Sequence, residues 1–243
     1  RMYRWLGEAG VKLPREVGSP SQISCPCLVK FPGAKGGRGM FVASSPEEFE
    51  QKVEEMVFRG LISPEEAQRP VIQELVVGVR YYPHFFYTPL FANGYRVADG
   101  RLELLGIDRR IESNIDELHR VVTASRGGSW PEPSYVVTGN LPMVVREALL
   151  EKLFDIASSV VEASLKLFPP GMVGPFCVET ICTPDLDFVV FEVSARIVAG
   201  TNLYPMGSPY SHLLFDEPMS TGRRIAHEVR EASKRGKLSE VIY

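Results

Sequence analysis

The sequence is poor in the residues that build zinc sites and disulfide frameworks. Its 243 residues include only four cysteines and four histidines. The cysteines occur as Cys25-Pro-Cys27 and as Cys177 and Cys182, which is not the C-x-x-C spacing of a zinc site. We therefore expect reduced, mostly buried thiols, as in a cytoplasmic protein, and no metal held by sulfur.

Long apolar runs and a strong excess of one charge are also lacking. No run approaches the roughly 20 residues that cross a bilayer, and the first residues do not resemble a signal peptide. A formal net charge of −3 gives no general affinity for nucleic acid. The apolar fraction of 44% is that of a globular chain with a real core. We expect small-molecule partners, with neither nucleic acid nor membrane.

Glycines and lysines are concentrated between two β-leaning runs, in residues 30–42, KFPGAKGGRGMFV. The pattern predicts a hairpin whose tip carries Gly36 and Gly37, where the backbone can approach a bound anion closely. Lys30 on the strand and Lys35 in the loop would bring two positive charges to a polyanion. Because Gly36 follows Lys35, the run is no Walker A loop, and no register gives a dinucleotide fingerprint. The hypothesis is a lid over a nucleoside triphosphate; the alternative is an ordinary glycine-rich hairpin with solvated lysines.

The next segments predict the rest of a small α+β unit. Ser45 and Ser63 each precede Pro-Glu-Glu, which indicates two helix starts, with the longer helix ending near Gly60. Residues 71–79 are expected to form a strand that carries Glu74. A glutamate beside free strand-edge backbone can bind a purine edge, although a solvent-facing Glu74 is the alternative.

Two further strands are expected over residues 80–91 and 102–111. The first is aromatic and holds two prolines, so we expect an edge strand or a curved one. The second runs into DRRIESN at residues 108–114, which is rich in forked donors and in acceptors. Arginine forks suit phosphate and carboxylate groups, so Arg110 is a candidate ligand-binding residue. A solvated charged turn is the alternative.

The second half of the chain predicts two helices around a β-hairpin. A short strand over residues 135–138 ends at Asn140, and Pro142 is expected to open the longest helix, which reaches about residue 168. A charged helix is expected over residues 221–237, with Ile225, Ala226 and Val229 facing inward.

The hairpin pairs two carboxylates. Residues 173–182 and 187–194 are apolar runs around a Pro-Asp-Leu-Asp turn. A hairpin centred between Asp185 and Leu186 places Glu179 opposite Glu192, with Cβ atoms about 5 Å apart. At an effective dielectric of about 20 the two charges would repel by roughly 3 kcal/mol. A shared Mg²⁺ would remove that cost; an arginine bridging the pair, such as Arg196, is the alternative.

This order of parts resembles the ATP-grasp ligases. The two-lysine glycine lid, the strand with Glu74 and the E…E-x-S-x-R hairpin carry the resemblance. It implies an α+β ATP-grasp fold, in which Lys30 and Lys35 bind phosphate and Glu179 and Glu192 bind Mg²⁺ or Mn²⁺. Ser194 stands where the family has asparagine, which leaves a third protein ligand to the metal open.

Further motifs narrow the resemblance to the archaeal formate-dependent 5-formaminoimidazole-4-carboxamide ribonucleotide (FAICAR) synthetases. They are GAKGGRG, GIDRRIESN, TGNLP, GPFCVE and FEVSARIVAGTN with MGSPYS. The resemblance implies ATP-dependent ligation of formate to the amine of 5-aminoimidazole-4-carboxamide ribonucleotide (AICAR) through formyl phosphate, in purine (IMP) biosynthesis. The products are FAICAR, ADP and phosphate, and the enzyme is expected to be a homo-oligomer.

The same resemblance assigns site residues. The ATP-binding set is Lys30, Lys35, Gly36, Gly37, Glu74, Leu75, Val76 and Glu112. The substrate-binding residues are Asn140 and Arg110, and the catalytic residues are Lys30, Lys35 and Arg196. Asn140 has an alternative role as a helix N-cap before Pro142.

The domain organisation follows from these assignments. Because the chain opens at Arg1 with a helix already under way, we expect its numbering to start within a longer protein. Residues 1–20 would then be the end of a preceding domain and a linker, residues 21–80 the lid subdomain, and residues 81–243 the main subdomain. Two other functions remain open: another ATP-grasp carboxylate–amine ligase, and a nucleotide-binding paralogue without ligase activity.

Overall fold

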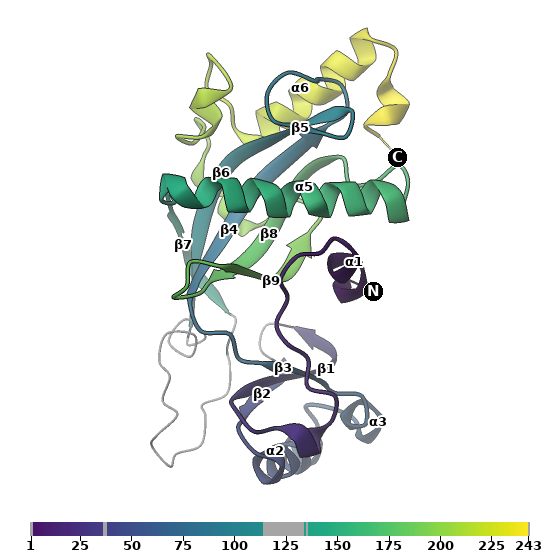
Figure 1. The fold of residues 1–243 in the computed structure, drawn as a ribbon, viewed down its shortest axis with the longest axis vertical. Helices are drawn as coiled ribbons and strands as arrows, with labels where there is room; N and C mark the ends of the chain where they lie inside the picture. The colour runs from purple at the N-terminus through teal and green to yellow at the C-terminus, as the bar shows by residue number, and fades with distance from the viewer. Residues whose placement is uncertain (1, 36–37, 114–133, 135, 243) are drawn as a thin grey trace. The chain divides into compact units, whose positions relative to one another are not determined.

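A computed structural model describes residues 2–35, 38–113, 134 and 136–242 (Figure 1). The chain divides into two compact units, each of which is described by itself. The first comprises Arg1–Leu13, Arg80–Arg110 and Asn140–Tyr243, and the second comprises Pro14–Val79 and Ile111–Gly139. Residues 2–13 therefore pack with the larger unit, where Leu6 is fully buried in the core.

The second unit is built on a three-stranded sheet in the order β2-β1-β3. Its strands are β1 (Cys27–Lys35), β2 (Arg38–Ala43) and β3 (Val71–Glu74). β1 and β2 form the antiparallel hairpin that the glycines predict, with Lys30 opposite Met40. β3 pairs with the other edge of β1 and ends at Glu74, so the expected strand over residues 71–79 is too long.

Two capped helices cover this small sheet, and their starts were predicted correctly. α2 (Pro46–Phe58) begins where the Ser45 side chain accepts a hydrogen bond from the Glu48 backbone N–H. α3 (Pro64–Ala67) has a full capping box between Ser63 and Glu66. A cluster of apolar side chains fills the space between helices and sheet and includes Val29, Phe41, Phe49, Met56 and Ile72.

The first unit is built on a six-stranded sheet in the order β5-β6-β4-β8-β9, with β7 paired to β6. The strands are β4 (Val79–Thr88), β5 (Arg96–Val97), β6 (Gly100–Glu112), β7 (Val137–Pro142), β8 (Gly174–Cys182) and β9 (Phe188–Ser194). The expected edge position of the aromatic strand is wrong, because β4 lies between β6 and β8. A β-bulge between His84 and Phe85 interrupts its register next to Pro83.

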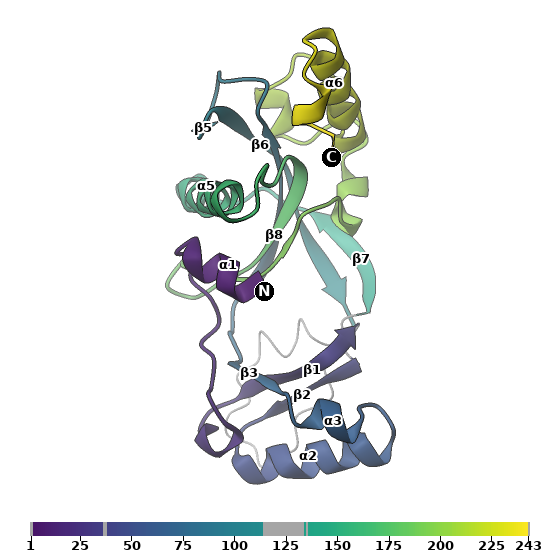
Figure 2. The same ribbon diagram turned by 90° about the vertical axis from the view of Figure 1, so that its right-hand side faces the viewer.

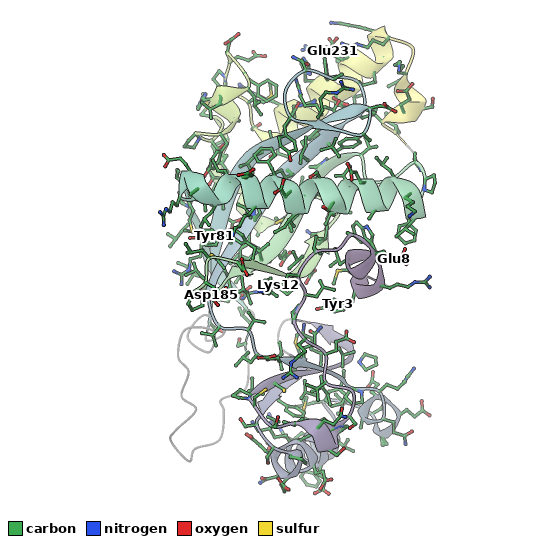
Figure 3. The ribbon with its side chains drawn as sticks, in the orientation of Figure 1. Tyr3, Glu8, Lys12, Tyr81, Asp185 and Glu231 are labelled. Atoms are coloured by element: carbon green, nitrogen blue, oxygen red, sulfur yellow. The ribbon has the colours of Figure 1, made fainter. Side chains whose placement is uncertain are left out.

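One face of this sheet is covered by α5 (Leu150–Leu167) and α1 (Met2–Glu8), as Figures 1 and 2 show. α1 is also tied to β9, because the hydroxyl of Tyr3, which is labelled in Figure 3, donates to the Phe191 carbonyl at 2.9 Å. The long helix starts later than expected. Pro142 ends β7, and a 3₁₀ turn over Glu147–Leu149 precedes α5. Leu153, Ala157, Val160 and Val161 of its predicted stripe are buried.

The last long helix, α6 (Thr221–Lys234), turns an unexpected face inward. We expected Ile225, Ala226 and Val229 to be buried, but Ala226 and Val229 are exposed. The buried residues are Thr221, Arg224, Glu228 and Ala232. The reason is electrostatic, because Arg224 bonds to Glu103 of the sheet and to Glu228 on its own helix.

All four cysteines are free thiols, and three of them are buried, as expected. Burial raises the pKa of the Cys27 thiol to about 12, and the neighbouring Cys25 adds to the shift. Within the described parts of the chain, no helix is long and apolar enough to cross a membrane.

Candidate functional site

Strand alternation separates apolar from polar side chains across the six-stranded sheet. Phe85, Leu104 and Val178 belong to the core that includes residues of α5. Because successive side chains in a strand point to opposite faces, their neighbours lie on the other face. The side chains on that other face are largely polar and buried. They include His84 and Tyr82 on β4, Glu103 and Asp108 on β6, and Glu179 on β8.

The two carboxylates of the β8–β9 hairpin face each other as predicted, with Glu179 paired to Glu192. Toward the turn the register shifts, since Thr180 pairs with Val190, so the extra residue Phe191 forms a β-bulge. The pairing predicted for a simple hairpin therefore holds from Glu179 back to Cys177, on the side of the bulge away from the turn. Glu179 is 4% exposed, whereas Glu192 is an exposed residue.

An arginine binds Glu179, but it is not the one that was expected. Arg110 donates through Nη1 to Oε2 at 3.1 Å and through Nη2 to Oε1 at 3.2 Å. Burial lowers the pKa of Arg110, but the attraction of Glu179 outweighs it and the pKa is raised. Arg196 is exposed and donates to the carbonyl of Ile197 at 2.6 Å. The expectation that Arg196 could bridge the carboxylates is therefore wrong for Glu179.

Two further groups complete the surroundings of Glu179. The Ser194 hydroxyl donates to its Oε1 at 3.1 Å. The Arg110 guanidinium lies 3.9 Å from the centroid of the Tyr82 ring, a cation–π contact. Burial raises the pKa of the Tyr82 hydroxyl above its usual range, and this hydroxyl has no hydrogen-bond partner among the described residues.

Asn140 lies on β7 beside a second buried carboxylate. Its Nδ2 donates to Oδ2 of Asp108 at 2.8 Å, and Nε2 of His84 lies 2.6 Å from Oδ1 of the same aspartate. Asp108 is fully buried and Asn140 is partly exposed. The alternative role of Asn140 as a helix cap is wrong, because the chain continues in β7 to Pro142 and helix begins only at Glu147.

The glycine hairpin of the second unit positions Lys30. The Lys30 Nζ donates to Oε1 of Gln73 at 3.1 Å. Lys35 ends β1 opposite Arg38. The Lys35 side chain, and Gly36 and Gly37 as a whole, lie outside the described residues.

The candidate adenine-binding residues follow the end of β3. Glu74 is half-exposed and accepts from Nε of Arg15 at 2.8 Å. It is therefore neither buried nor simply solvated. Leu75 is buried and its N–H donates to the Pro26 carbonyl, while Val76 is partly exposed. Glu112 is 4% exposed at the end of β6.

A divalent cation could be held by the opposed pair. In the part of the chain that the structure describes, no three His, Cys, Asp or Glu side chains gather as a complete metal site. Two carboxylates are nevertheless the usual protein share of a magnesium site that substrate phosphates complete. Oε1 of Glu179 accepts from both Arg110 and Ser194, whereas Oε2 accepts from Arg110 alone among the described residues and retains a lone pair for a cation. Glu179 and Glu192 thus fit the chemistry of such a site.

Sequence reasoning missed Asp108 and His84 as the anchor of Asn140, and Arg110 as the partner of Glu179. Strand alternation was the available signal for Asp108 and Arg110, since they lie two residues apart on one strand. The partner residues are far along the chain, and a single sequence gives no register between β6, β7 and β8.

The architecture and the opposed carboxylates define the class of protein, which is the ATP-grasp fold. The chain is similar to the crystal structure of an IMP biosynthesis protein PurP from Thermococcus kodakaraensis, with 26% identity and a TM-score of 0.67, covering 99% of this chain and 66% of that one. It also matches the ADP complex of an N5-carboxyaminoimidazole ribonucleotide synthetase, with 17% identity and a TM-score of 0.53, over 83% of this chain and 45% of that chain. The second likeness supports the fold alone.

The chain belongs to the family described as domain of unknown function DUF1297, whose model matches residues 48–243. A relative from Korarchaeum cryptofilum is 52% identical over all of this chain and 65% of its own length. One from Methanopyrus kandleri is 45% identical over 100% of this chain and 67% of its own length. Both are named 5-formaminoimidazole-4-carboxamide-1-(beta)-D-ribofuranosyl 5'-monophosphate synthetase. The chain thus spans about two thirds of these relatives.

Proposed function

We propose that the protein ligates formate to the amine of AICAR at the expense of ATP, giving FAICAR, ADP and phosphate. The observation that carries the proposal is the opposed pair Glu179 and Glu192 on the polar face of an ATP-grasp sheet. The names of the relatives give the product, FAICAR, from which the proposed substrates follow. The reaction belongs to the cytoplasm, and its substrates are small molecules.

The chemistry needs two transfers. A formate oxygen attacks the γ-phosphorus of ATP, the bond to the bridging oxygen breaks, and ADP leaves with formyl phosphate remaining. The AICAR amine nitrogen then attacks the formyl carbon, the C–O bond to phosphate breaks, and the nitrogen loses a proton. Phosphorylation is required because formate itself has no good leaving group. The protein's task is therefore to position the reactants and to neutralise their charge.

The proposed roles of the residues follow from their chemistry. Lys30 and Lys35 bind the triphosphate, Glu74 to Val76 bind adenine, and Glu112 binds the nucleotide. Glu179 and Glu192 would hold Mg²⁺ or Mn²⁺, which neutralises phosphate charge when bound. Arg196, exposed just after β9, contributes a further positive charge to phosphate.

Arg110 has a more specific role than general substrate binding. It holds the Glu179 carboxylate with two parallel hydrogen bonds. This fixes the carboxylate plane and offsets part of its charge. Substrate contact by Arg110 would therefore be additional to this carboxylate contact.

The test is ADP release by the complete natural protein with ATP, Mg²⁺ and AICAR, with formate present or omitted. We expect release only with formate, and FAICAR as product by mass spectrometry. Release that continues equally without formate would overturn the proposed reaction. No release under any condition, with nucleotide still bound, would point to a paralogue without ligase activity.

Glu192→Gln separates the metal role from folding. Because Glu192 is exposed, the change should leave the free energy of unfolding within about 0.5 kcal/mol of the wild type, while turnover falls at least about 100-fold. Glu162→Gln on the exposed face of α5 is the matched control and should leave turnover unchanged. Normal turnover of Glu192→Gln would remove Glu192 from the metal site.

A further inference from the structure

Asn140 does not have a freely rotating amide. Its nitrogen faces Asp108, whose carboxylate can only accept hydrogen bonds. Rotating the amide by 180° would bring its oxygen against a carboxylate oxygen at the same separation of 2.8 Å. Two acceptors repel at that distance, so the contact fixes which atom faces Asp108.

Asp108 is itself held on several sides. His84 of β4 bonds to its other oxygen, and Asp108 is fully buried. A Cβ built on Gly200 would come within 2.1 Å of Oδ1 of Asp108, so the chain after β9 packs directly on this carboxylate. The aspartate therefore has little room to change its rotamer.

The same segment is fastened to β6. The Tyr204 hydroxyl donates to the Ile107 carbonyl, next to Asp108. It also accepts from the Met143 N–H at 3.3 Å, three residues after Asn140. A Cβ on Gly106 would come within 2.5 Å of the Tyr204 ring. Asp108 and Asn140 thus lie in a packed part of the sheet and not at a loose rim.

The contact with Asp108 also fixes the position of the other amide atom of Asn140, Oδ1. Among the described residues, the only hydrogen bond recorded for the Asn140 side chain is the one to Asp108. Its Oδ1 is directed away from Asp108, and Asn140 is partly exposed. An orientation-locked amide presents a fixed acceptor, which pairs with an N–H donor and not with an anionic oxygen.

We propose that Asp108 is a positioning residue that locks Asn140, so that Oδ1 accepts an N–H group from an aminoimidazole carboxamide and rejects the corresponding carboxylate. This inference rests on the proposed function, because it deepens the choice of substrate. AICAR offers N–H donors on its 5-amine and its 4-carboxamide. The analogue with a 4-carboxylate has an acceptor in place of the amide donor. A buried mismatch of this kind leaves polar groups unpaired and lowers affinity.

The first experiment measures binding as well as turnover. The dissociation constants of AICAR and of its 4-carboxylate analogue are determined by calorimetry for the wild type and for Asp108→Asn. An asparagine at position 108 can donate or accept, so the Asn140 amide is no longer locked. We expect AICAR affinity to fall about tenfold, and the preference for carboxamide over carboxylate to shrink about tenfold or more. The KM for ATP should stay within about twofold.

A swapped double variant tests the same point even if Asp108→Asn folds poorly. In Asp108→Asn with Asn140→Asp, the amide at 108 donates to one carboxylate oxygen at 140, and the other oxygen is again a fixed acceptor. We expect carboxamide affinity to return to within about threefold of the wild type. Rejection of the 4-carboxylate should be stronger than in the wild type, because like charges now meet.

Glu103→Gln is the matched control, since Glu103 is another fully buried carboxylate of β6 that bonds to Arg224 and not to Asn140. It should lower stability without altering the ratio of the two dissociation constants. Unchanged selectivity in a folded Asp108→Asn protein would overturn the proposal, as would a swapped variant that binds AICAR more than about tenfold weaker than the wild type. Failure of the wild type to bind AICAR would instead overturn the proposed function.

Discussion

Two arginines of the six-stranded unit, the partly exposed Arg110 and the fully buried Arg224, bind carboxylates in the same way and yet differ in what surrounds them. Arg110 binds Glu179 through two N–H groups at 3.1 and 3.2 Å. Arg224 binds Glu103 through two N–H groups at 2.6 and 3.1 Å. We call the surroundings of Arg110 the open cluster (Arg110, Glu179, Ser194, Tyr82 and the opposed Glu192). We call those of Arg224 the closed cluster (Arg224, Glu103, Glu228 and Phe86).

The closed cluster is complete within the protein. Arg224 is fully buried and also bonds to Glu228, which accepts from Thr88 at 2.6 Å. Its guanidinium lies 4.2 Å from the centroid of the Phe86 ring. Arg101 donates to Glu103 as well, at 2.8 Å. Two arginines thus meet two glutamates in the interior, which leaves no reason for a ligand.

The open cluster has an exposed carboxylate at its edge. Glu179 is buried, but Glu192 opposite it reaches solvent. A buried arginine–carboxylate pair is therefore no indication of function by itself. The informative difference is the exposed second carboxylate, Glu192, which can bind a cation from solvent while its backbone stays paired in β9.

The largest effect is expected when the closed cluster is broken. Arg224→Met leaves Glu103 and Glu228 buried without their main cation, which should lower the free energy of unfolding by about 3–5 kcal/mol. Urea unfolding followed by fluorescence measures this. The adjacent, exposed Arg223→Met is the control and should cost less than about 0.5 kcal/mol. A loss below about 1 kcal/mol would show that the cluster is not essential for stability.

Breaking the open cluster should have a smaller effect that a cation can reverse. Arg110→Met leaves Glu179 without its arginine but next to Glu192. At 100 times its dissociation constant, Mg²⁺ should then raise the free energy of unfolding by about 2.7 kcal/mol. The same Mg²⁺ should not stabilise Arg224→Met beyond its effect on the wild type. Equal stabilisation of both variants would contradict the distinction between the clusters.

The hydroxyl of Tyr82 offers a finer comparison. Tyr82→Phe places a phenylalanine ring beside Arg110, as Phe86 already lies beside Arg224 in the closed cluster. The change removes a hydroxyl that has no hydrogen-bond partner among the described residues. Stability should change by less than about 0.5 kcal/mol. Tyr204→Phe, which loses bonds to Ile107 and Met143, should cost about 1–3 kcal/mol. Comparable losses from both changes would mean that the Tyr82 hydroxyl has a stabilising partner.

The smallest effect concerns pH at the edge of the closed cluster. The pKa of His227 is lowered from its usual 6.5, first by burial and then by the charge of Arg224. The unfolded chain therefore binds the proton more readily, so stability is highest above the unfolded pKa and falls as the pH drops through it. Urea midpoints at about pH 7.5 and about pH 5.5 should differ less in His227→Gln than in the wild type. An unchanged pH dependence would rule out His227 as its source.

Local signals in the sequence were sufficient for several parts of the fold. The Ser-Pro-Glu-Glu segments cap both helices of the small unit because the capping partners are three residues apart. The glycine-rich hairpin and the pairing of Glu179 with Glu192 also follow from short turns. In each case a few neighbouring residues fix the geometry, so one sequence is enough.

The tertiary structure alone decided which strands and faces are buried. Val229 was expected inside by its hydrophobicity, yet it is exposed because Arg224 and Glu228 bind partners on β6 and β4. β4 lies inside the sheet although it contains Pro83, and its register with β6 shifts at a bulge next to that proline. These outcomes depend on contacts between residues that are distant in the chain, such as Glu103 and Arg224, which are 121 positions apart.

In the candidate site, too, some residues could be found from the sequence and others only from the structure. The residues implied by the resemblance include Glu179, Glu192 and Asn140, and all three lie on strands. Their partners Arg110 and Asp108 come from β6, whose pairing with β7 and placement relative to β8 no local pattern specifies. The sequence by itself determined the candidate chemistry, because side-chain type and turn spacing are local properties. Only the tertiary structure decided which groups are held rigidly and which remain open, because burial and hydrogen bonding depend on strands distant in the chain.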